Sequence, residues 1–265
     1  MLWLVLTQFI LRLTFGVAVA MGVTSPRLVT SGFYRVHLWV LMGLNTFAAL
    51  AVYASREAYA PIGDWRLVLG LAIGIAVVSY VGSVLWLYEQ RLAGQIALYL
   101  AAIASLTAAA LATPWDSSGG ETVSRMEISL GFCNLISSGL LLGSTLSAML
   151  LGHWYLNTPT MELAPINRLV ALMAGAIVAR ALLAAVGLAL FASAQGALPT
   201  SFWIFVALRW LAGIVGTLVL AGLTWQTLKV PNTQSATGIL YAAVICAFIG
   251  ELTSQLLSAD TLYPL

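Results

Sequence analysis

The chain has 265 residues, of which 61% are hydrophobic and only 8% are charged. Soluble domains carry about 25% charged residues, so a soluble fold of this size could not cover its surface with so few. The mean hydropathy of +0.99 agrees. The net charge of +2 provides no basic surface that would hold nucleic acid. The composition therefore predicts an all-α, polytopic integral membrane protein.

Several chemistries are excluded because the residues they need are rare. Lys229 is the only lysine, which leaves no buried lysine for a Schiff base. The two cysteines, Cys133 and Cys246, lie far apart in apolar runs, so neither a disulfide framework nor an iron–sulfur cluster is expected. A metal or a heme held by this chain would depend on His37 and His153.

A helix needs about 20 apolar residues to cross the hydrocarbon core of a bilayer. Proline-containing loops separate such runs in this sequence. The first run has no basic segment before it and no small-residue cleavage site, so we expect it to be retained. Eight transmembrane helices are predicted, at residues 3–23, 34–54, 66–88, 92–113, 128–153, 167–193, 201–226 and 234–257.

With eight spans, both ends of the chain lie on one side of the membrane, here named side A, and the opposite side is side B. Basic residues are more frequent in the side B loops: Arg27, Arg35, Arg91, Arg168 and Lys229, against Arg56, Arg66 and Arg125 on side A. Most acidic residues are predicted on side A: Glu57, Asp64, Asp116, Glu121, Glu127 and Asp260. Basic loops stay in the cytoplasm, so we expect a multi-pass protein of the cell (inner) membrane with extracytoplasmic termini.

Tryptophans are predicted to form a belt at each membrane interface. Those expected near side A are Trp3, Trp65, Trp115 and Trp203, and those near side B are Trp39, Trp86, Trp154 and Trp225.

The two halves of the chain, 1–113 and 128–257, show faint similarity and are candidates for two four-helix bundles. Trp86 precedes a Gly-Gln-Ile-Ala-Leu-Tyr segment at 94–99, and Trp225 precedes Gly-Ile-Leu-Tyr-Ala-Ala at 238–243. Gly70-xxx-Gly74 and Gly139-xxx-Gly143 predict close helix packing inside the bundle, because small residues let backbones approach.

Four ionisable residues fall inside predicted spans: Arg12, Arg180, Arg209 and Glu251. A charge in the hydrocarbon core costs at least about 2.5–3.5 kcal/mol, so each needs a partner or a function. By depth, all four lie between the midplane and side A. They form either a salt bridge that locks two helices or a pocket for a ligand with acceptor oxygens, such as a quinone or a lipid headgroup. Membrane-embedded Asn45 and Gln95 are further candidates.

His37 and His153 are both expected near side B, each beside tryptophan and tyrosine residues. Such histidines anchor helices at the interface, hydrogen-bond a quinone carbonyl and pass its protons, or ligate a b-type heme axially from two helices. All three roles are compatible with the pattern.

No catalytic motif for a hydrolase, metalloprotease, P-loop protein or dinucleotide-binding protein is present. Ion-coupled carriers use helices that are broken near the midplane. Here the prolines fall between the spans, which counts against a carrier.

The last predicted helix contains Phe-Ile-Gly-Glu-Leu-Thr-Ser-Gln-Leu-Leu at 248–257, preceded by Leu208-Arg209-Trp210-Leu211. These segments resemble the membrane anchor subunits of DMSO-reductase and polysulfide-reductase type, with Glu251 as the matched position. The family's arginine after Gly-Glu-Leu is replaced here by Thr253, Ser254 and Gln255. The resemblance implies eight spans, outside termini, no heme, and electron exchange between a quinone and an iron–sulfur partner.

The sequence therefore favours a quinone-interacting, membrane-anchoring subunit of a respiratory electron-transfer complex. Its partners would be the lipid bilayer and further subunits, including an iron–sulfur or cytochrome electron carrier. The alternatives are a non-catalytic structural or assembly subunit, a b-heme protein using His37 and His153, and a transporter of small solutes or lipids using the four buried charges.

Overall fold

The computed structural model describes residues 2–59, 62–115, 124–158, 160–194, 198–230, 232–259 and 263–265. These parts of the chain contain helices and no strands. The helices are α1 (Leu2–Val23), α2 (Ser31–Ala54), α3 (Arg56–Tyr59), α4 (Trp65–Leu87), α5 (Arg91–Leu111), α6 (Arg125–Asn157), α7 (Ala164–Ala194), α8 (Thr200–Leu208), the π-helix η1 (Arg209–Gly216), α9 (Thr217–Leu228) and α10 (Thr233–Leu257).

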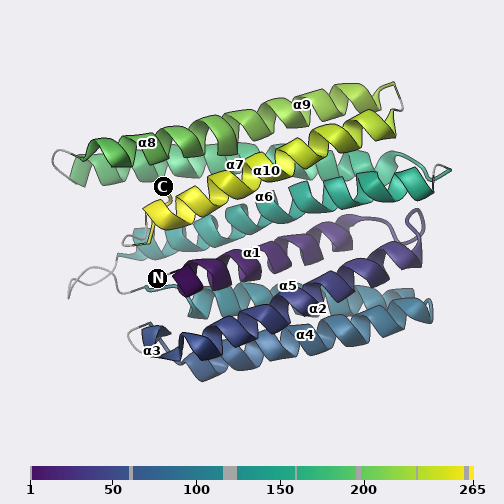
Figure 1. Ribbon diagram of the computed structural model, residues 1–265, viewed down its shortest axis with the longest axis horizontal. Coiled ribbons are helices and arrows are strands. Elements are labelled where there is room, and N and C mark those ends of the chain that lie inside the picture. The colour runs from purple at the N-terminus through teal and green to yellow at the C-terminus, as the bar shows by residue number, and fades with distance from the viewer. Residues whose placement is uncertain are drawn as a thin grey trace.

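Eight helical stretches are long and apolar enough to cross a membrane, with α8, η1 and α9 forming one of them. They run side by side along the long axis of the molecule, and both ends of the chain lie at the same end of the bundle (Figure 1). The predicted all-α, eight-span fold is confirmed. Two elements were not predicted, the short α3 and the π-helical turn inside the seventh span.

Polar side chains set several helix starts. The Asp64 carboxylate accepts a hydrogen bond from the Arg66 backbone N–H at the start of α4. Ser124 and Glu127 form a capping box at the start of α6, and the Asn232 side chain caps α10 through the Ser235 backbone N–H. Each cap satisfies backbone N–H groups that a helix leaves unpaired at its first turn.

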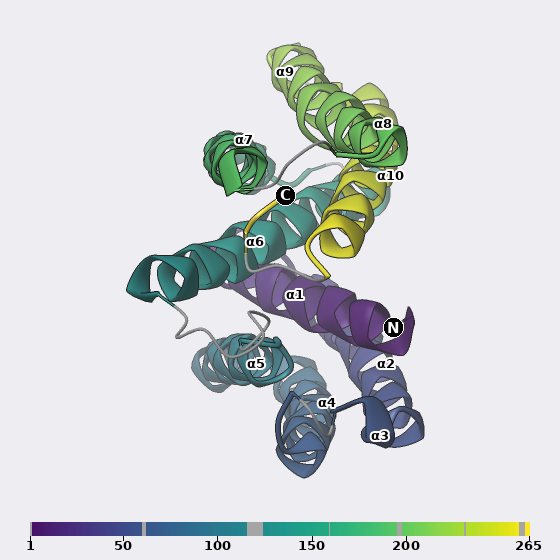
Figure 2. The same cartoon turned by 90° about the vertical axis from the view of Figure 1, so that its left-hand side faces the viewer.

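Viewed along the long axis, the helices form two groups (Figure 2). In one group α1, α2, α4 and α5 pack in a ring, and in the other α6, α7, the α8–η1–α9 span and α10 do so. The groups meet mainly where α1 packs on α6. We name them the N-terminal group and the C-terminal group.

The joint between the groups depends on glycines. Cβ atoms added at Gly16 or Gly143 would overlap backbone atoms of the facing helix, and one added at Gly139 would lie 2.8 Å from the Arg12 carbonyl oxygen. The prediction for Gly139-xxx-Gly143 is confirmed. The prediction for Gly70-xxx-Gly74 is wrong, because both glycines are exposed on the outside of α4 with nothing within 4 Å of an added Cβ.

The aromatic residues also divide between the surface and the interior. Trp3, Trp39, Trp203 and Trp225 have exposed fractions of 44–49%, as expected for side chains at the membrane surface. Trp86 instead is buried, stacked on Tyr34 with ring centroids 4.0 Å apart. Its environment therefore differs from that of Trp225, although the sequence around the two looks similar.

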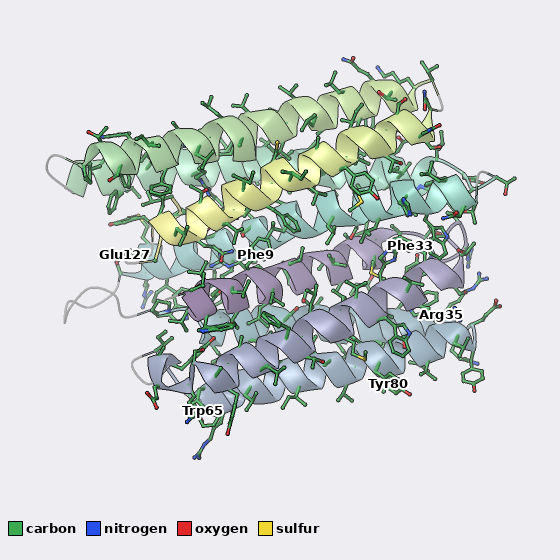
Figure 3. All side chains as sticks on the ribbon, viewed as in Figure 1. Phe9, Phe33, Arg35, Trp65, Tyr80 and Glu127 are labelled. Atoms are coloured by element: carbon green, nitrogen blue, oxygen red, sulfur yellow. The ribbon has the colours of Figure 1, made fainter. Side chains whose placement is uncertain are left out.

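Charged side chains gather at the two ends of the bundle. In Figure 3, Trp65 and Glu127 lie towards the end that holds the termini, side A, and Arg35 lies towards side B. Asp116, Glu121 and Asp260, which the sequence also assigns to side A, lie outside the described residues.

Candidate functional site

A buried ion pair joins α7 to α10 in the C-terminal group. Arg180 Nε lies 2.8 Å from Glu251 Oε1, and Arg180 Nη2 lies 3.0 Å from Glu251 Oε2. The exposed fractions are 0% for Arg180 and 2% for Glu251. This two-point geometry is the strongest form of arginine–carboxylate contact, and it fixes the relative positions of the two helices.

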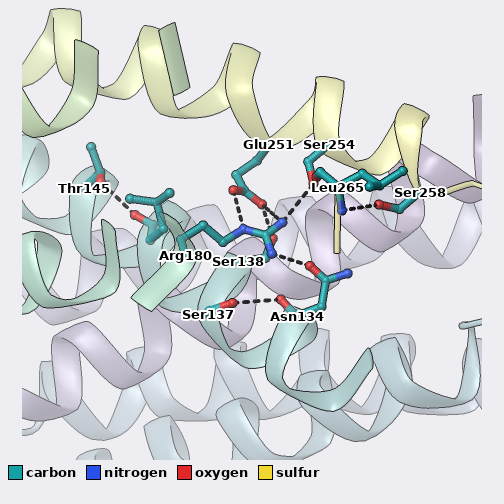
Figure 4. Close-up of polar contacts among 10 residues, drawn as sticks. Asn134, Ser137, Ser138, Thr145, Arg180, Glu251, Ser254, Ser258 and Leu265 are labelled. Atoms are coloured by element: carbon teal, nitrogen blue, oxygen red, sulfur yellow. Dashed lines mark hydrogen bonds and ion pairs between the residues drawn. The ribbon is translucent and has the colours of Figure 1, made fainter. Parts of the chain in front are cut away.

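The pair is surrounded by polar side chains that complete its hydrogen bonds (Figure 4). From α6, Ser138 donates to Glu251 Oε2, and the Asn134 side-chain oxygen accepts from Arg180 Nη1. From α10, Ser254 Oγ accepts from Arg180 Nη2 at 2.9 Å. Arg180 and Glu251 thus form a neutral, extensively hydrogen-bonded unit shared by three helices.

The segment 263–265 returns to this region. Ser254 Oγ lies 2.5 Å from the Leu265 oxygen, and Leu265 is 2% exposed. A Cβ added at Gly187 of α7 would contact Pro264. The segment packs against the side A end of the polar shell.

Arg209 has no comparable partner. Its side chain is 1% exposed, and all three guanidinium nitrogens are buried without a hydrogen-bond partner among the described residues. It interacts electrostatically with Arg180, Glu251 and Arg12. A buried charge without a partner is costly, so this arginine is the most unusual polar group of the fold.

Arg12 is only partly satisfied. Its Nε donates to Gln8 Oε1 at 3.3 Å, and Gln8 Nε2 in turn donates to the Ala109 carbonyl of α5 and to Thr113. Arg12 is 8% exposed and interacts electrostatically with Arg180 and Glu251. The structure therefore brings together all four ionisable residues that the sequence singles out.

The backbone changes at Arg209. Residues 209–216 form the π-helix η1, a wide turn found frequently at functional sites. Gly213 packs against Gly250 so closely that a Cβ on either would overlap the other's backbone. The α8–η1–α9 span and α10 run antiparallel, so Arg209, one turn before Gly213, lies at the level of Ser254 and Gln255, one turn after Gly250.

Gln255 is a second buried group without partners. Both polar atoms of its amide lack a hydrogen bond among the described residues, and its exposed fraction is 7%. Of the two other polar candidates, Asn45 binds Thr14 across α2 and α1 and also the Leu41 carbonyl, so it has a packing role. Gln95 is half-buried on α5.

The two histidines face different helices. His37 is buried, its Nδ1 lies 2.6 Å from the Phe33 carbonyl oxygen, and its ring packs near Trp154 of α6. His153 is exposed, and its Nδ1 lies 3.4 Å from the Tyr241 hydroxyl of α10. A heme ligated by both histidines would need the two rings to face one iron. The heme alternative therefore stays a prediction without support from this geometry.

An apolar groove lies elsewhere, between α2 and α4 of the N-terminal group. Its volume is about 590 Å³, and Met42, Tyr53, Ile73 and Tyr80 are among its lining residues. Its lining includes none of the four charged residues. Within the described residues, no group of three histidine, cysteine or acidic side chains is arranged to hold a metal ion.

Sequence reasoning missed the π-helix, the polar shell from α6 and the free amide of Gln255. Ser138 and Asn134 looked like ordinary polar residues of an apolar helix, and only three-dimensional packing places them on Arg180. The signal for the π-helix was weak: Gly213 and Gly216 follow a mid-span arginine.

Comparisons with protein-family models, curated proteins and solved structures give no match for this chain. The resemblance to the DMSO-reductase-type anchor subunits therefore stays a prediction.

Proposed function

We propose that this protein is the quinone-interacting, membrane-anchoring subunit of an electron-transfer complex in the cell (inner) membrane. The observation that supports the proposal is Arg209, a buried guanidinium group whose nitrogens have no hydrogen-bond partner among the described residues. Quinone carbonyl oxygens are acceptors, and a guanidinium group and an amide N–H are donors.

The residues that would hold a quinone headgroup are Arg209 and Gln255, whose polar atoms lack partners at the same level of the bundle. Arg12 would add positive charge from α1. The hydrogen-bonded Arg180–Glu251 pair would position α7 and α10 around the headgroup. A bound quinone supplies reversible electron and proton transfer, and these residues supply hydrogen bonds and orientation.

The electrons would come from another subunit. Cys133 and Cys246 are free cysteines, and ligation of an iron–sulfur cluster by protein thiolates takes more than these two residues. An iron–sulfur or cytochrome partner at one end of the bundle would therefore complete the complex.

Quantifying quinone in the purified protein tests this function. We expect quinone to co-purify in mild detergent with the wild type and with Arg168→Gln, which changes an exposed arginine of α7. We expect at least tenfold less with Arg209→Gln, because a hydrogen bond to a charged group contributes about 1.5–3 kcal/mol. The proposal fails if the wild type holds no quinone, or if all three proteins hold the same amount.

The π-helix favours transport of a small solute or lipid as a second candidate function. Carriers interrupt their helices near the binding site, and η1 interrupts the seventh span at Arg209. Uptake of a labelled anion or lipid by liposomes that contain this protein alone would favour transport, and lack of uptake would leave the quinone proposal in place.

A further inference from the structure

The charges around Arg209 do not balance. Arg12, Arg180 and Arg209 are positive and Glu251 is negative, and the exposed fractions of the four residues are 0–8%. Arg180 and Glu251 neutralise each other through two hydrogen bonds. Two positive charges, on Arg12 and Arg209, are left inside the bundle without an ion-pair partner among the described residues.

Among the described residues, no carboxylate forms an ion pair with Arg12 or Arg209. Glu251 is the only acidic residue in the interior of a described span. Glu127, in the first turn of α6, is engaged with Ser124 and with the Tyr263 hydroxyl. In sequence, the remaining acidic residues lie at helix ends or between helices.

Arginine does not lose its proton to escape such a site, because the guanidinium group is a very weak acid that stays charged in proteins. A charge left unpaired in the protein interior costs several kcal/mol. An anion beside Arg209, within the electrostatic reach of Arg12, would offset this cost.

We infer that the ligand of this site is an amphiphile with an anionic oxygen headgroup, such as a phosphate, a carboxylate or an ionised hydroxyl, joined to an apolar tail. This inference rests on the proposed function only in that both require a ligand at Arg209. It narrows the chemical class of that ligand from any acceptor of hydrogen bonds to an anion.

The surroundings of the cluster fit an apolar tail. On the outside of η1, Leu211 and Val215 have exposed fractions of 68% and 48%, so the segment that holds Arg209 also faces lipid. On the α1 side, Phe9 and Phe248 meet edge to face at 5.1 Å, three residues before Arg12 and Glu251 respectively. Apolar side chains therefore flank the cluster on two sides, as an apolar tail requires.

Thermal unfolding in a neutral maltoside detergent, which carries no phosphate, tests the inference. The probes are dodecyl phosphate, the uncharged analogue dodecanol, inorganic phosphate and a short-chain neutral benzoquinone. We expect dodecyl phosphate, and not dodecanol, to raise the unfolding temperature of the wild type and of Arg168→Gln. Arg209→Gln and Arg12→Gln should each need at least tenfold more dodecyl phosphate for the same shift, since each removes a charged hydrogen bond.

The four probes distinguish the possible kinds of ligand. A shift with dodecyl phosphate alone supports a lipid-type headgroup, and an equal shift with inorganic phosphate supports a free oxyanion. An equal shift with dodecanol, or an undiminished shift in both arginine variants, overturns the inference. Stabilisation by benzoquinone without any effect of the anions would overturn the anionic class and keep the quinone proposal. The reverse result would keep the anionic class and overturn the quinone proposal.

Discussion

The N-terminal and C-terminal groups share one helix arrangement but differ in the side chains that they bury. Each packs four antiparallel spans in a ring, one on either side of the α1–α6 joint. Inside the N-terminal group, most polar contacts are between neutral groups, such as Asn45 with Thr14, and the large buried aromatics stack, as Tyr34 does on Trp86; Arg12, which donates to Gln8, is the exception. Inside the C-terminal group lie the Arg180–Glu251 pair and the unpartnered Arg209.

The difference indicates that a four-helix ring of this kind can pack largely through neutral hydrogen bonds and aromatic contacts. Because a buried charge costs energy, its confinement to the C-terminal group and to the face of α1 that meets it marks that region for function. The comparison can be tested by changing equivalent features in the two groups.

The largest effect is expected from Glu251→Leu. It leaves Arg180 buried without its partner, so we expect a loss of about 3–5 kcal/mol in the free energy of unfolding. Denaturant unfolding in detergent measures it. The double variant Arg180→Met/Glu251→Leu should regain most of the loss, because it removes both charges together; a double variant as unstable as the single one would contradict this account.

Arg209→Met should act in the opposite direction. Without a ligand it removes an unpaired buried charge, so we expect a gain of stability approaching about 2.5–3.5 kcal/mol in the same unfolding assay. Arg180→Met is the matched control and should lose stability. A loss in both variants would show that Arg209 has a stabilising partner.

The joint between the two groups should tolerate less change than the outer surface of the N-terminal group. Gly143→Ala places a methyl group into the Gly16 backbone and should cost about 1–3 kcal/mol. Gly74→Ala meets open space and should be neutral or slightly stabilising, by up to about 1 kcal/mol from helix propensity. Equal costs at the two sites would contradict the packing described for α1 and α6.

The smallest effect is expected for the neutral polar contact of the N-terminal group. Asn45→Ala removes one hydrogen bond to Thr14 and should cost about 0.6–1.7 kcal/mol. The unfolding temperatures of Asn45→Ala and Glu251→Leu, measured side by side, provide the comparison. A loss as large as that of Glu251→Leu would remove the distinction between the two groups.

Most of the fold could be predicted from the sequence because the bilayer imposes length and hydropathy on each span. Close packing at Gly139 and Gly143 was also predicted from their spacing, although the spacing did not identify α1 as the partner. Gly70 and Gly74 have the same spacing and no contact, because spacing alone does not say whether a helix face meets protein or lipid.

The candidate site could be predicted only as a set of residues. Charged residues inside spans are rare, so Arg12, Arg180, Arg209 and Glu251 could be picked out from the sequence. Their positions along the spans predicted that they lie at a similar depth. Which arginine pairs with Glu251 depends on the rotation of α7, η1 and α10 about their axes, and local sequence does not encode that rotation. The π-helix changes the directions in which the side chains of the seventh span point, so the orientation of Arg209 is harder still to predict from the sequence.

The position of α1 has a consequence for biogenesis. This helix precedes the other described helices in the chain, and most of its residues are buried in the finished bundle. Much of that burial comes from α6, which follows only after α2, α4 and α5. During synthesis the Gly16 face and Arg12 must therefore wait, next to lipid or to the insertion machinery, until the second half of the chain arrives. Although α1 precedes the other described helices, it is thus among the last to reach its final surroundings.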